Sequence, residues 1–313
     1  MRRLKNLLFT SAAVFVLALF SVTVIAQQES RQTGSGLQIT PTRFELSENP
    51  GTTKRIVIGL KNVSGGEIIA KPVINDFESD DETGQPKIVT EREANSPRSI
   101  SKFVSGIGDL RLKDDETKDT SVTLKIPKDT PAGAYYGVIR YEAIPVQDKD
   151  QGNIALTGSV GTIVLLEVKG DIAESMQINY ARAELDGKSS KLFVKPPNKA
   201  AVEVENTGNS FLKPFGKVSI AKNGKEVYSY ELNNAKPRGN ILPDSKRIFR
   251  DDIHNVSGIG KYTLTASLAF GEGGEVIIQQ STFWMIPLIY IIIAAAVLLI
   301  LAIAAIIIRR KNR

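Results

Sequence analysis

The segment Pro-Ala-Gly-Ala-Tyr-Tyr-Gly-Val-Ile-Arg-Tyr-Glu, residues 131–142, decides the fold class. Beyond the Pro-Ala-Gly turn, alternate positions share one face of an extended chain: Tyr135, Gly137, Ile139 and Tyr141. Arg140 and Glu142 lie on the opposite face. Because side chains alternate across a strand, this period of two predicts a β-strand with one buried and one solvated face.

Other stretches of the first half repeat the pattern. Apolar residues alternate with polar or small ones in two further segments, at Ile56, Ile58 and Leu60 and again at Val122, Leu124 and Ile126. Gly, Pro, Asn and Asp separate these segments, which is typical of an antiparallel β-sandwich. Tyr135 enters its strand just after a Gly turn and so resembles the tyrosine corner of immunoglobulin-like sandwiches, where the hydroxyl binds a preceding turn.

The second half has the same plan in a different sequence. Asn206 opens a turn placed as Asn62 is in the first half, and Gly260-Lys261-Tyr262 matches Gly133-Ala134-Tyr135. We therefore expect an all-β protein with two immunoglobulin-like sandwiches, at residues 37–170 and 171–283, joined near residues 169–175.

The C-terminus predicts a membrane anchor. An unbroken apolar run covers residues 286–308, so we expect a transmembrane helix at 284–308 and a basic cytoplasmic tail at 309–313. Two groups of residues should anchor this helix at the interfaces of the bilayer: Phe283 and Trp284 outside, and Arg309, Arg310 and Lys311 inside.

The N-terminus predicts export. Residues 1–26 combine a basic start, an apolar stretch and small residues before Gln27, which is typical of a signal peptide. An uncleaved anchor is the alternative, and it gives the same topology. Residues 27–36 are polar and rich in Gly and Ser, so we expect a disordered lead-in.

Charge and composition exclude several classes of function. The formal charge is +6, but seven cations lie in the two terminal segments, which leaves 33 Lys and Arg against 34 Asp and Glu in the exported body. Such a body has no electrostatic footprint for nucleic acid. The chain has no Cys, so its stability must come from buried area and sheet hydrogen bonds rather than disulfides.

Residues for catalysis or metal binding are scarce. His254 is the only histidine, and there is no nucleophile-elbow motif, so we expect no enzyme activity and no cofactor. The acidic stretch from Asp76 to Glu82 offers oxygen ligands, but its spacing fits no established calcium loop. A solvated turn is the favoured interpretation, and we expect no metal site.

The segment 158–170 is apolar on both faces. Val164 and Leu166 lie on one face, and Ile163 and Leu165 lie on the other. Such a strand is either central between packed layers, which is the favoured interpretation, or a surface that awaits a partner. If exposed, Ile163 and Leu165 are the candidates for protein binding by sheet packing or strand addition.

Several motifs carry a resemblance to a known family. They are Thr-Arg-Phe at 42–44, Asn-Pro-Gly at 49–51, Lys-Asn-Val-Ser-Gly at 61–65, the segment at 131–139, and Gly-Ser-Val-Gly-Thr at 158–162. With them the chain resembles the WxL-interacting surface-protein family, which has two immunoglobulin-like modules, a membrane helix and a basic tail. The resemblance implies contacts with peptidoglycan and with other surface proteins. The first half is also similar to periplasmic pilus chaperones, and that similarity implies a binding role for Arg43.

These observations predict a single-pass protein whose body faces outward and works by binding. Its expected partners are membrane lipid, peptidoglycan and other surface proteins. A membrane-tethered, chaperone-like factor for the assembly of surface proteins is the first alternative. An envelope hydrolase is the second, and it would need a concave cluster of carboxylates, which the sequence neither shows nor excludes.

Overall fold

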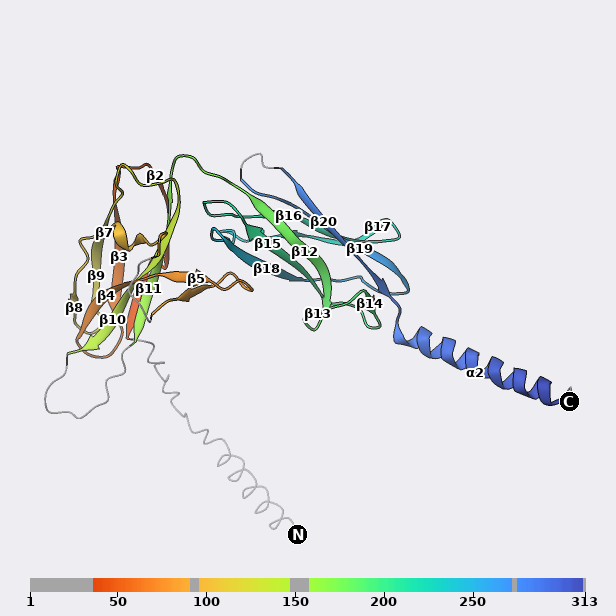
Figure 1. Ribbon diagram of the computed structural model, residues 1–313. Coiled ribbons are helices and arrows are strands. Elements are labelled where there is room, and N and C mark those ends of the chain that lie inside the picture. Colours follow the sequence, from red (N-terminus) through yellow and green to blue (C-terminus); the bar gives the residue numbers. More distant parts are fainter. Residues whose placement is uncertain (1–35, 91–95, 147–157, 272–274, 312–313) are drawn as a thin grey trace, which may run out of the picture. The chain divides into compact units, whose positions relative to one another are not determined.

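The computed structural model describes residues 36–90, 96–146, 158–271 and 275–311. This part of the chain is all-β, with one C-terminal α-helix (Figure 1). The predicted signal peptide and almost all of the predicted lead-in lie outside the described residues.

Two sheets form the first sandwich. The four-stranded sheet has the order β1-β3-β9-β7, with β1 at Leu37–Thr40, β3 at Thr53–Asn62, β9 at Thr117–Lys125 and β7 at Val104–Ser105. The five-stranded sheet has the order β2-β11-β10-β4-β8, with β2 at Arg43–Glu48, β11 at Ser159–Val168, β10 at Gly133–Pro145, β4 at Ile68–Asn75 and β8 at Leu110–Leu112. A small hairpin, β5 at Phe77–Ser79 and β6 at Pro86–Ile88, and the short helix η1 at Ile100–Lys102 complete it.

Two further sheets form the second sandwich. One has the order β13-β12-β15-β18, with β13 at Lys188–Ser189, β12 at Met176–Leu185, β15 at Lys199–Asn206 and β18 at Ser245–Asp252. The other has the order β14-β20-β19-β16-β17, with β14 at Leu192–Phe193, β20 at Ile277–Met285, β19 at Gly260–Ala269, β16 at Phe215–Lys222 and β17 at Lys225–Leu232.

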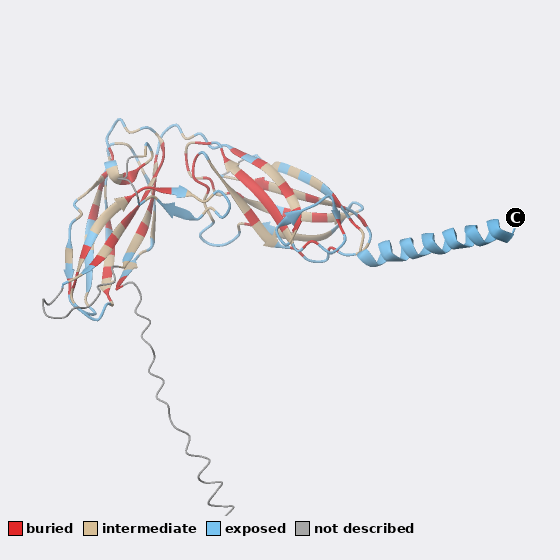
Figure 2. Cartoon of the chain, turned by 60° about the horizontal axis from the view of Figure 1, so that its bottom comes forward, coloured by how far each residue is buried: buried red, intermediate tan, exposed pale blue. Residues whose placement is uncertain are grey.

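Each sandwich has its own apolar core. Its residues are those that the alternation of apolar and polar residues along the strands predicts to face inward. In β3, Ile56, Ile58 and Leu60 are at most 4% exposed, whereas Val57 between them is 47% exposed. In β19, Tyr262, Leu264 and their alternate neighbours are fully buried. Buried residues therefore run along the inward faces of the strands (Figure 2). Burying an aliphatic side chain of this size contributes roughly 1.5–3 kcal/mol.

A buried asparagine closes an equivalent turn in each sandwich. The Asn62 amide donates to the carbonyl of Gly66 at 2.6 Å, and its oxygen accepts from Ser64 N at 3.0 Å. The Asn206 amide donates to Ser210 O at 2.8 Å, and its oxygen accepts from Gly208 N at 2.9 Å. Both asparagines are buried, so these bonds satisfy amides that would otherwise be costly to desolvate.

Both tyrosines bind the turn before their strand. Tyr135 Oη donates to the carbonyl of Pro131 at 2.9 Å, which confirms the predicted tyrosine corner. Tyr262 Oη donates to the carbonyl of Ser257, so the second sandwich has the same contact. The parallel between the two halves therefore extends to individual hydrogen bonds.

The C-terminal helix α2, Leu288–Lys311, begins later than the predicted residue 284. Trp284 and Met285 still belong to β20, and Met285 is 1% exposed in the second core. Phe283 was expected at the membrane interface, but it is 3% exposed and packs against Phe193 and Tyr262, with ring centroids 5.4 and 5.3 Å away. The expectation for Phe283 fails because strand alternation turns this side chain inward, whereas Trp284 points outward and is 49% exposed.

Among the described residues, α2 is the one helix long and apolar enough to cross a membrane. It has 24 residues, its mean hydropathy reaches 3.5, and all of its side chains are exposed. At the helical rise it is about 36 Å long, which fits a hydrocarbon core of about 30 Å. Arg309, Arg310 and Lys311 form its last turn.

Candidate binding site where the sandwiches meet

Strand β11 packs on both faces. Val164, Leu166 and Val168 lie in the first core. Ile163 and Leu165 belong instead to a small apolar cluster, which we name the bridging cluster, made of Phe77, Tyr136, Val138, Ile163, Leu165, Phe211 and Leu242. Leu165 is only 4% exposed.

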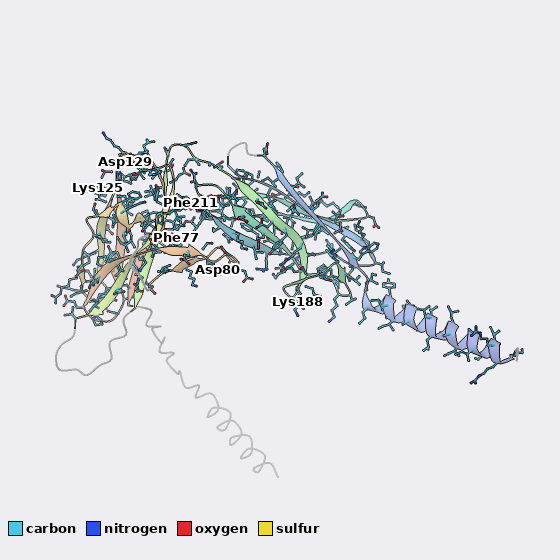
Figure 3. The ribbon with its side chains drawn as sticks, viewed as in Figure 1. Phe77, Asp80, Lys125, Asp129, Lys188 and Phe211 are labelled. Atoms are coloured by element: carbon cyan, nitrogen blue, oxygen red, sulfur yellow. The ribbon has the colours of Figure 1, made fainter. Side chains whose placement is uncertain are left out.

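The bridging cluster contains residues of both sandwiches. Phe77 comes from β5, and Phe211 comes from a loop of the second sandwich (Figure 3). Leu242 comes from another loop of the second sandwich. The Tyr136 ring lies between two others, with its centroid 5.1 Å from that of Phe77 and 6.3 Å from that of Phe211. The second sandwich of the same chain thus covers the outer face of β11.

Both edges of β11 are also paired. β10 runs antiparallel along one edge, and β2 runs parallel along the other from Ile163 to Val168. Addition of a partner strand beside Ile163 and Leu165 would require β2 to leave first.

Arg43 begins β2 and has mixed surroundings. Its Nη2 lies 2.6 Å from Glu45 Oε1, whereas its Nε is buried without a hydrogen-bond partner among the described residues. Glu45 in turn binds Lys213 Nζ of the second sandwich at 2.5 Å. Arg43 therefore belongs to a charged contact between the sandwiches.

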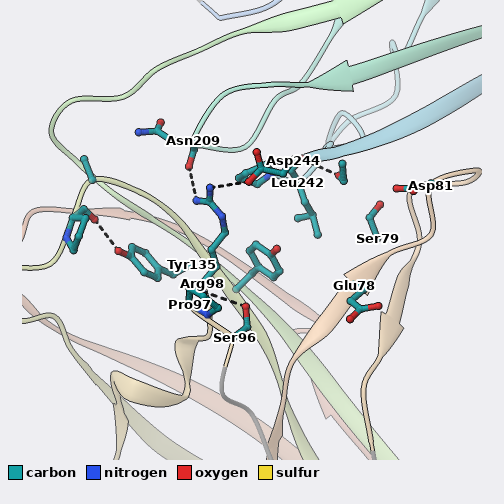
Figure 4. A pocket seen from close by; sticks show the side chains of 15 residues that line it. Glu78, Ser79, Asp81, Ser96, Pro97, Arg98, Tyr135, Asn209, Leu242 and Asp244 are labelled. Atoms are coloured by element: carbon teal, nitrogen blue, oxygen red, sulfur yellow. Dashed lines mark hydrogen bonds and ion pairs between the residues drawn. The ribbon is translucent and has the colours of Figure 1, made fainter. Parts of the chain in front are cut away.

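A cavity of about 780 Å³ opens where the two sandwiches meet (Figure 4). Its lining comes from the β5–β6 hairpin, from the loop before η1, from the start of β10, and from two loops of the second sandwich. The polar residues among them are Glu78, Ser79, Asp81, Ser96, Arg98, Tyr135, Tyr136, Asn209, Asp244 and Ser245.

Arg98 connects the two sandwiches in this cavity. Its Nη1 donates to Asn209 O and its Nη2 to Asp244 Oδ2, both at 3.1 Å (Figure 4). The backbone carbonyl of Arg98 accepts from Tyr136 N at 2.8 Å, which fixes its loop on β10. The backbone of Arg98 is thus bound to the first sandwich, and its guanidinium is held by two atoms of the second.

In the second sandwich, the Asn-Thr-Gly-Asn turn at 206–209 accepts hydrogen bonds from the first sandwich. Asn209 O accepts from Ala134 N at 2.9 Å as well as from Arg98. Asn209 Oδ1 accepts from Ala173 N at 2.9 Å, which binds the connecting segment to the same turn. A Cβ on Gly133 would lie 2.8 Å from Asn209 O, so this close approach of two backbones requires glycine.

The hairpin makes a second set of contacts. Ile248 N of β18 donates to Glu82 O at 3.0 Å, and Arg250 Nη1 lies 3.0 Å from Glu82 Oε1. Asp80 shapes the hairpin turn because its carboxylate accepts from Glu82 N at 2.8 Å, and this bond holds its pKa below the ordinary value. The acidic stretch is therefore a structured turn that contacts the second sandwich.

Charged side chains of both signs line the cavity. Glu78, Asp81 and Asp244 outnumber Arg98, so the lining is acidic. Burial raises the pKa of Tyr136, which keeps its hydroxyl neutral. Within the described residues no group of His, Asp and Glu could hold a metal ion, and His254 packs edge-on against Tyr228.

Sequence reasoning did not find Arg98 or Asn209 as site residues. Arg98 lies in an irregular loop with no periodicity around it. Asn209 belongs to a turn that was recognised as a turn only. Their roles depend on contacts across more than 100 residues of sequence, which no local pattern encodes.

No protein-family model matches the chain, and no curated protein matches it. Among solved structures, the class 5 fimbriae chaperone CfaA is 12% identical with a TM-score of 0.40, over 80% of this chain and 99% of that one. The chaperone YadV is 10% identical with a TM-score of 0.37, over 79% and 100%. The E. coli chaperone DraB is 14% identical with a TM-score of 0.35, over 79% and 96%.

Proposed function

We propose that this protein is a membrane-anchored binding and scaffolding protein of the envelope and that its partners are other exported proteins. The observation that carries the proposal is the preformed cavity of about 780 Å³ where two sandwiches of one chain are fastened together. Concave surfaces between domains are common sites of recognition.

The placement of the body supports this proposal. β20 ends at Met285 and α2 begins at Leu288, so two residues separate the second sandwich from the apolar helix. With α2 in a bilayer and its basic last turn in the cytoplasm, the whole body faces outward. A short connection of this kind holds the second sandwich at the membrane surface.

The cavity lining favours a protein partner. The three carboxylates can accept hydrogen bonds from peptide N–H groups or from a basic side chain. The fixed guanidinium can donate to peptide carbonyls. The exposed prolines beside them, Pro97 and Pro131, supply area for a hydrophobic contact. Peptidoglycan is the competing partner, and retention on purified cell wall separates the two.

A tethered assembly factor for other surface proteins is the second candidate function. A specific observation favours it, because the outer edge of the last strand of the second sandwich is paired over only two residues in the described part of the chain. A factor that holds unfinished strands of other proteins needs such an edge.

Site-specific photo-crosslinking in intact cells tests the proposal. A photoreactive residue in place of Asp244, whose side chain is 74% exposed at the cavity, should crosslink to exported proteins. The matched control replaces Val57, which is 47% exposed on the outer face of β3. Equal crosslinking from both positions would contradict a role for the cavity.

Retention on purified cell wall tests the competing partner. The soluble fragment must include Met285, because a fragment that ends earlier removes core residues of β20. If residues 36–285 bind wall material while no exported protein crosslinks at Asp244, a wall-binding role replaces the one proposed. Loss of particular surface proteins on deletion of the gene would favour the assembly factor.

A further inference from the structure

The outer edge of β20 is open over most of its length. β19 pairs with one edge from Ile277 to Met285. On the other edge, β14 pairs only with Trp284 and Met285. No other strand in the described part of the chain forms ladder hydrogen bonds with the seven residues from Ile277 to Phe283, although β12 of the facing sheet lies close to β20.

The direction of the free backbone groups follows from the bonds that exist. Trp284 N donates outward to Lys191 O at 2.8 Å, and Ile286 N donates outward to Phe193 O at 2.9 Å. Because N–H and C=O groups alternate between the two edges of a strand, Ile278, Gln280 and Thr282 present theirs to the open edge. They form a template for one more strand.

This edge lacks the usual protection against pairing. No charged residue and no proline occurs from Val276 to Ile286. Val276 and Ile278 are 60% and 59% exposed. Edge strands in soluble proteins are normally short, charged or interrupted by proline. The edge strand β17 in the same sheet, for comparison, has Lys225, Glu226 and Glu231.

A cavity of about 310 Å³ adjoins the end of this edge nearest to β14. Ser281, Thr282 and Phe283 line it on one side, and Arg182, Ser189, Ser190 and Lys191 line it on the other. Arg182 is paired with Glu184 at 3.0 Å, whereas the structure gives no ion pair to Lys191 among the described residues. The end of the open edge is therefore suited to an acidic side chain.

We propose that the open edge of β20 binds an extended segment of another exported protein as an added strand. The segment is uncharged along the ladder and has an acidic residue at the end that reaches Lys191. This inference rests on the proposed function and names a second contact surface, separate from the cavity at Arg98. Backbone hydrogen bonds supply the affinity, and the acidic residue sets the register.

A second copy of the chain fits less well. In an antiparallel pair of β20 strands the two Phe283 residues lie at opposite ends of a seven-residue ladder, roughly 20 Å apart. Both strands nevertheless lead into α2 within a few residues. Two copies in one bilayer could pair in this way only with both strands lying along the membrane surface.

The test uses the full chain in lipid nanodiscs and synthetic seven-residue peptides of alternating Thr and Val. One peptide has Asp at its C-terminus and another has Asp at its N-terminus, so that the better binder gives the strand direction. A third has the alternate amides N-methylated, which blocks ladder formation and keeps the side chains. We expect an Asp peptide to slow hydrogen exchange at the amides of Ile278, Gln280 and Thr282, and the methylated peptide to leave it unchanged.

A matched pair of variants tests the backbone directly. Gln280→Pro removes one outward N–H, and Gln280→Ala removes the same side chain but keeps the N–H. We expect Gln280→Pro to weaken peptide binding about tenfold or more and Gln280→Ala to change it less than about twofold. Equal binding by both variants would overturn the proposal. If Gln280→Pro does not fold, the methylated peptide on the unaltered chain still decides.

Two further outcomes would also overturn it. Self-pairing would show as a disulfide between two Gln280→Cys chains, which is readable because the natural chain has no cysteine. Contact with lipid would show as protection of the three amides in nanodiscs without peptide. Either result leaves the cavity experiment at Asp244 unaffected, so failure of this inference is distinct from failure of the proposed function.

Discussion

The last strand of the first sandwich, β11, corresponds to the last strand of the second, β20. The two strands differ in how much of the outer edge is paired with a neighbouring strand. In the first sandwich, β2 covers β11 over six residues. In the second, β14 covers β20 over two. The buried asparagine and the tyrosine contact are the same in both. The shared contacts therefore maintain the fold, and the difference at the edge determines which sandwich can accept another strand.

The faces of the two strands differ as well. The outer face of β11 is covered by the second sandwich through the bridging cluster. The outer face of β20 has Ile278 and Trp284 exposed, at 59% and 49%. The first sandwich thus uses its apolar surface within the chain, whereas the second leaves an apolar surface next to the membrane helix.

The largest expected effect is the difference in stability loss between two neighbouring substitutions at the end of β20, one of a core residue and one of an exposed residue. Phe283→Ala should lower the free energy of unfolding by about 3–5 kcal/mol, because it leaves a cavity beside Phe193 and Tyr262. Trp284→Ala should cost under about 1 kcal/mol, because its side chain is half exposed. Denaturant unfolding of residues 36–285 measures both. Similar costs for the two variants would contradict the assigned end of the sandwich.

The next effect tests whether the buried asparagines are equivalent. Asn62→Ala and Asn206→Ala should each cost about 2–3 kcal/mol, because carbonyls that accept from the buried amide lose their donor. Thermal unfolding of the two variants gives the comparison. A large loss of stability in one sandwich and none in the other would show that the two asparagines contribute unequally although their hydrogen bonds have the same geometry.

Removal of the tyrosine hydroxyls should have a smaller effect. Tyr135→Phe and Tyr262→Phe each delete one hydrogen bond to a turn and leave the packing unchanged, which should cost about 0.5–1.5 kcal/mol. Denaturation midpoints at unchanged slope measure this loss. A gain in stability from either change would mean that burying the hydroxyl costs more free energy than its hydrogen bond returns.

The smallest effect concerns the ion pairs that link the sandwiches. Lys213→Ala removes the exposed pair with Glu45 and should change the free energy of unfolding by under about 1 kcal/mol. Leu165→Ala, inside the bridging cluster, should cost more, about 2 kcal/mol or above. Should the order be reversed, charge rather than apolar packing would hold the sandwiches together.

Much of the fold could be predicted from local patterns. Alternation placed Ile56, Ile58 and Leu60 in the core, and the Gly-Ala-Tyr sequence predicted the hydrogen bond of Tyr135. The end of β20 could not be placed, because Phe283 and Trp284 continue into an apolar run that hides the change from strand to helix. Alternation through Thr282 and Phe283 was the available signal, and it was outweighed by the preference of aromatic residues for membrane interfaces.

The site was less predictable than the fold. The two apolar faces of β11 indicated a contact, but nothing local shows that Phe211 and Leu242 of the second sandwich supply it. The open edge of β20 likewise depends on which distant segment pairs beside it, and only the structure shows that β14 is short. The resemblance to the WxL-interacting surface proteins stays a prediction, and so does a role for Arg43 in binding a partner.

Hydrogen exchange in the purified full chain tests the central contrast most directly. The amides of Ile163 and Leu165, which face β2, should exchange slowly. Those of Ile278, Gln280 and Thr282, which face the open edge, should exchange close to the unprotected rate. Equal protection along both strands in the absence of any partner would contradict the account, because it would mean that the edge of β20 is already paired.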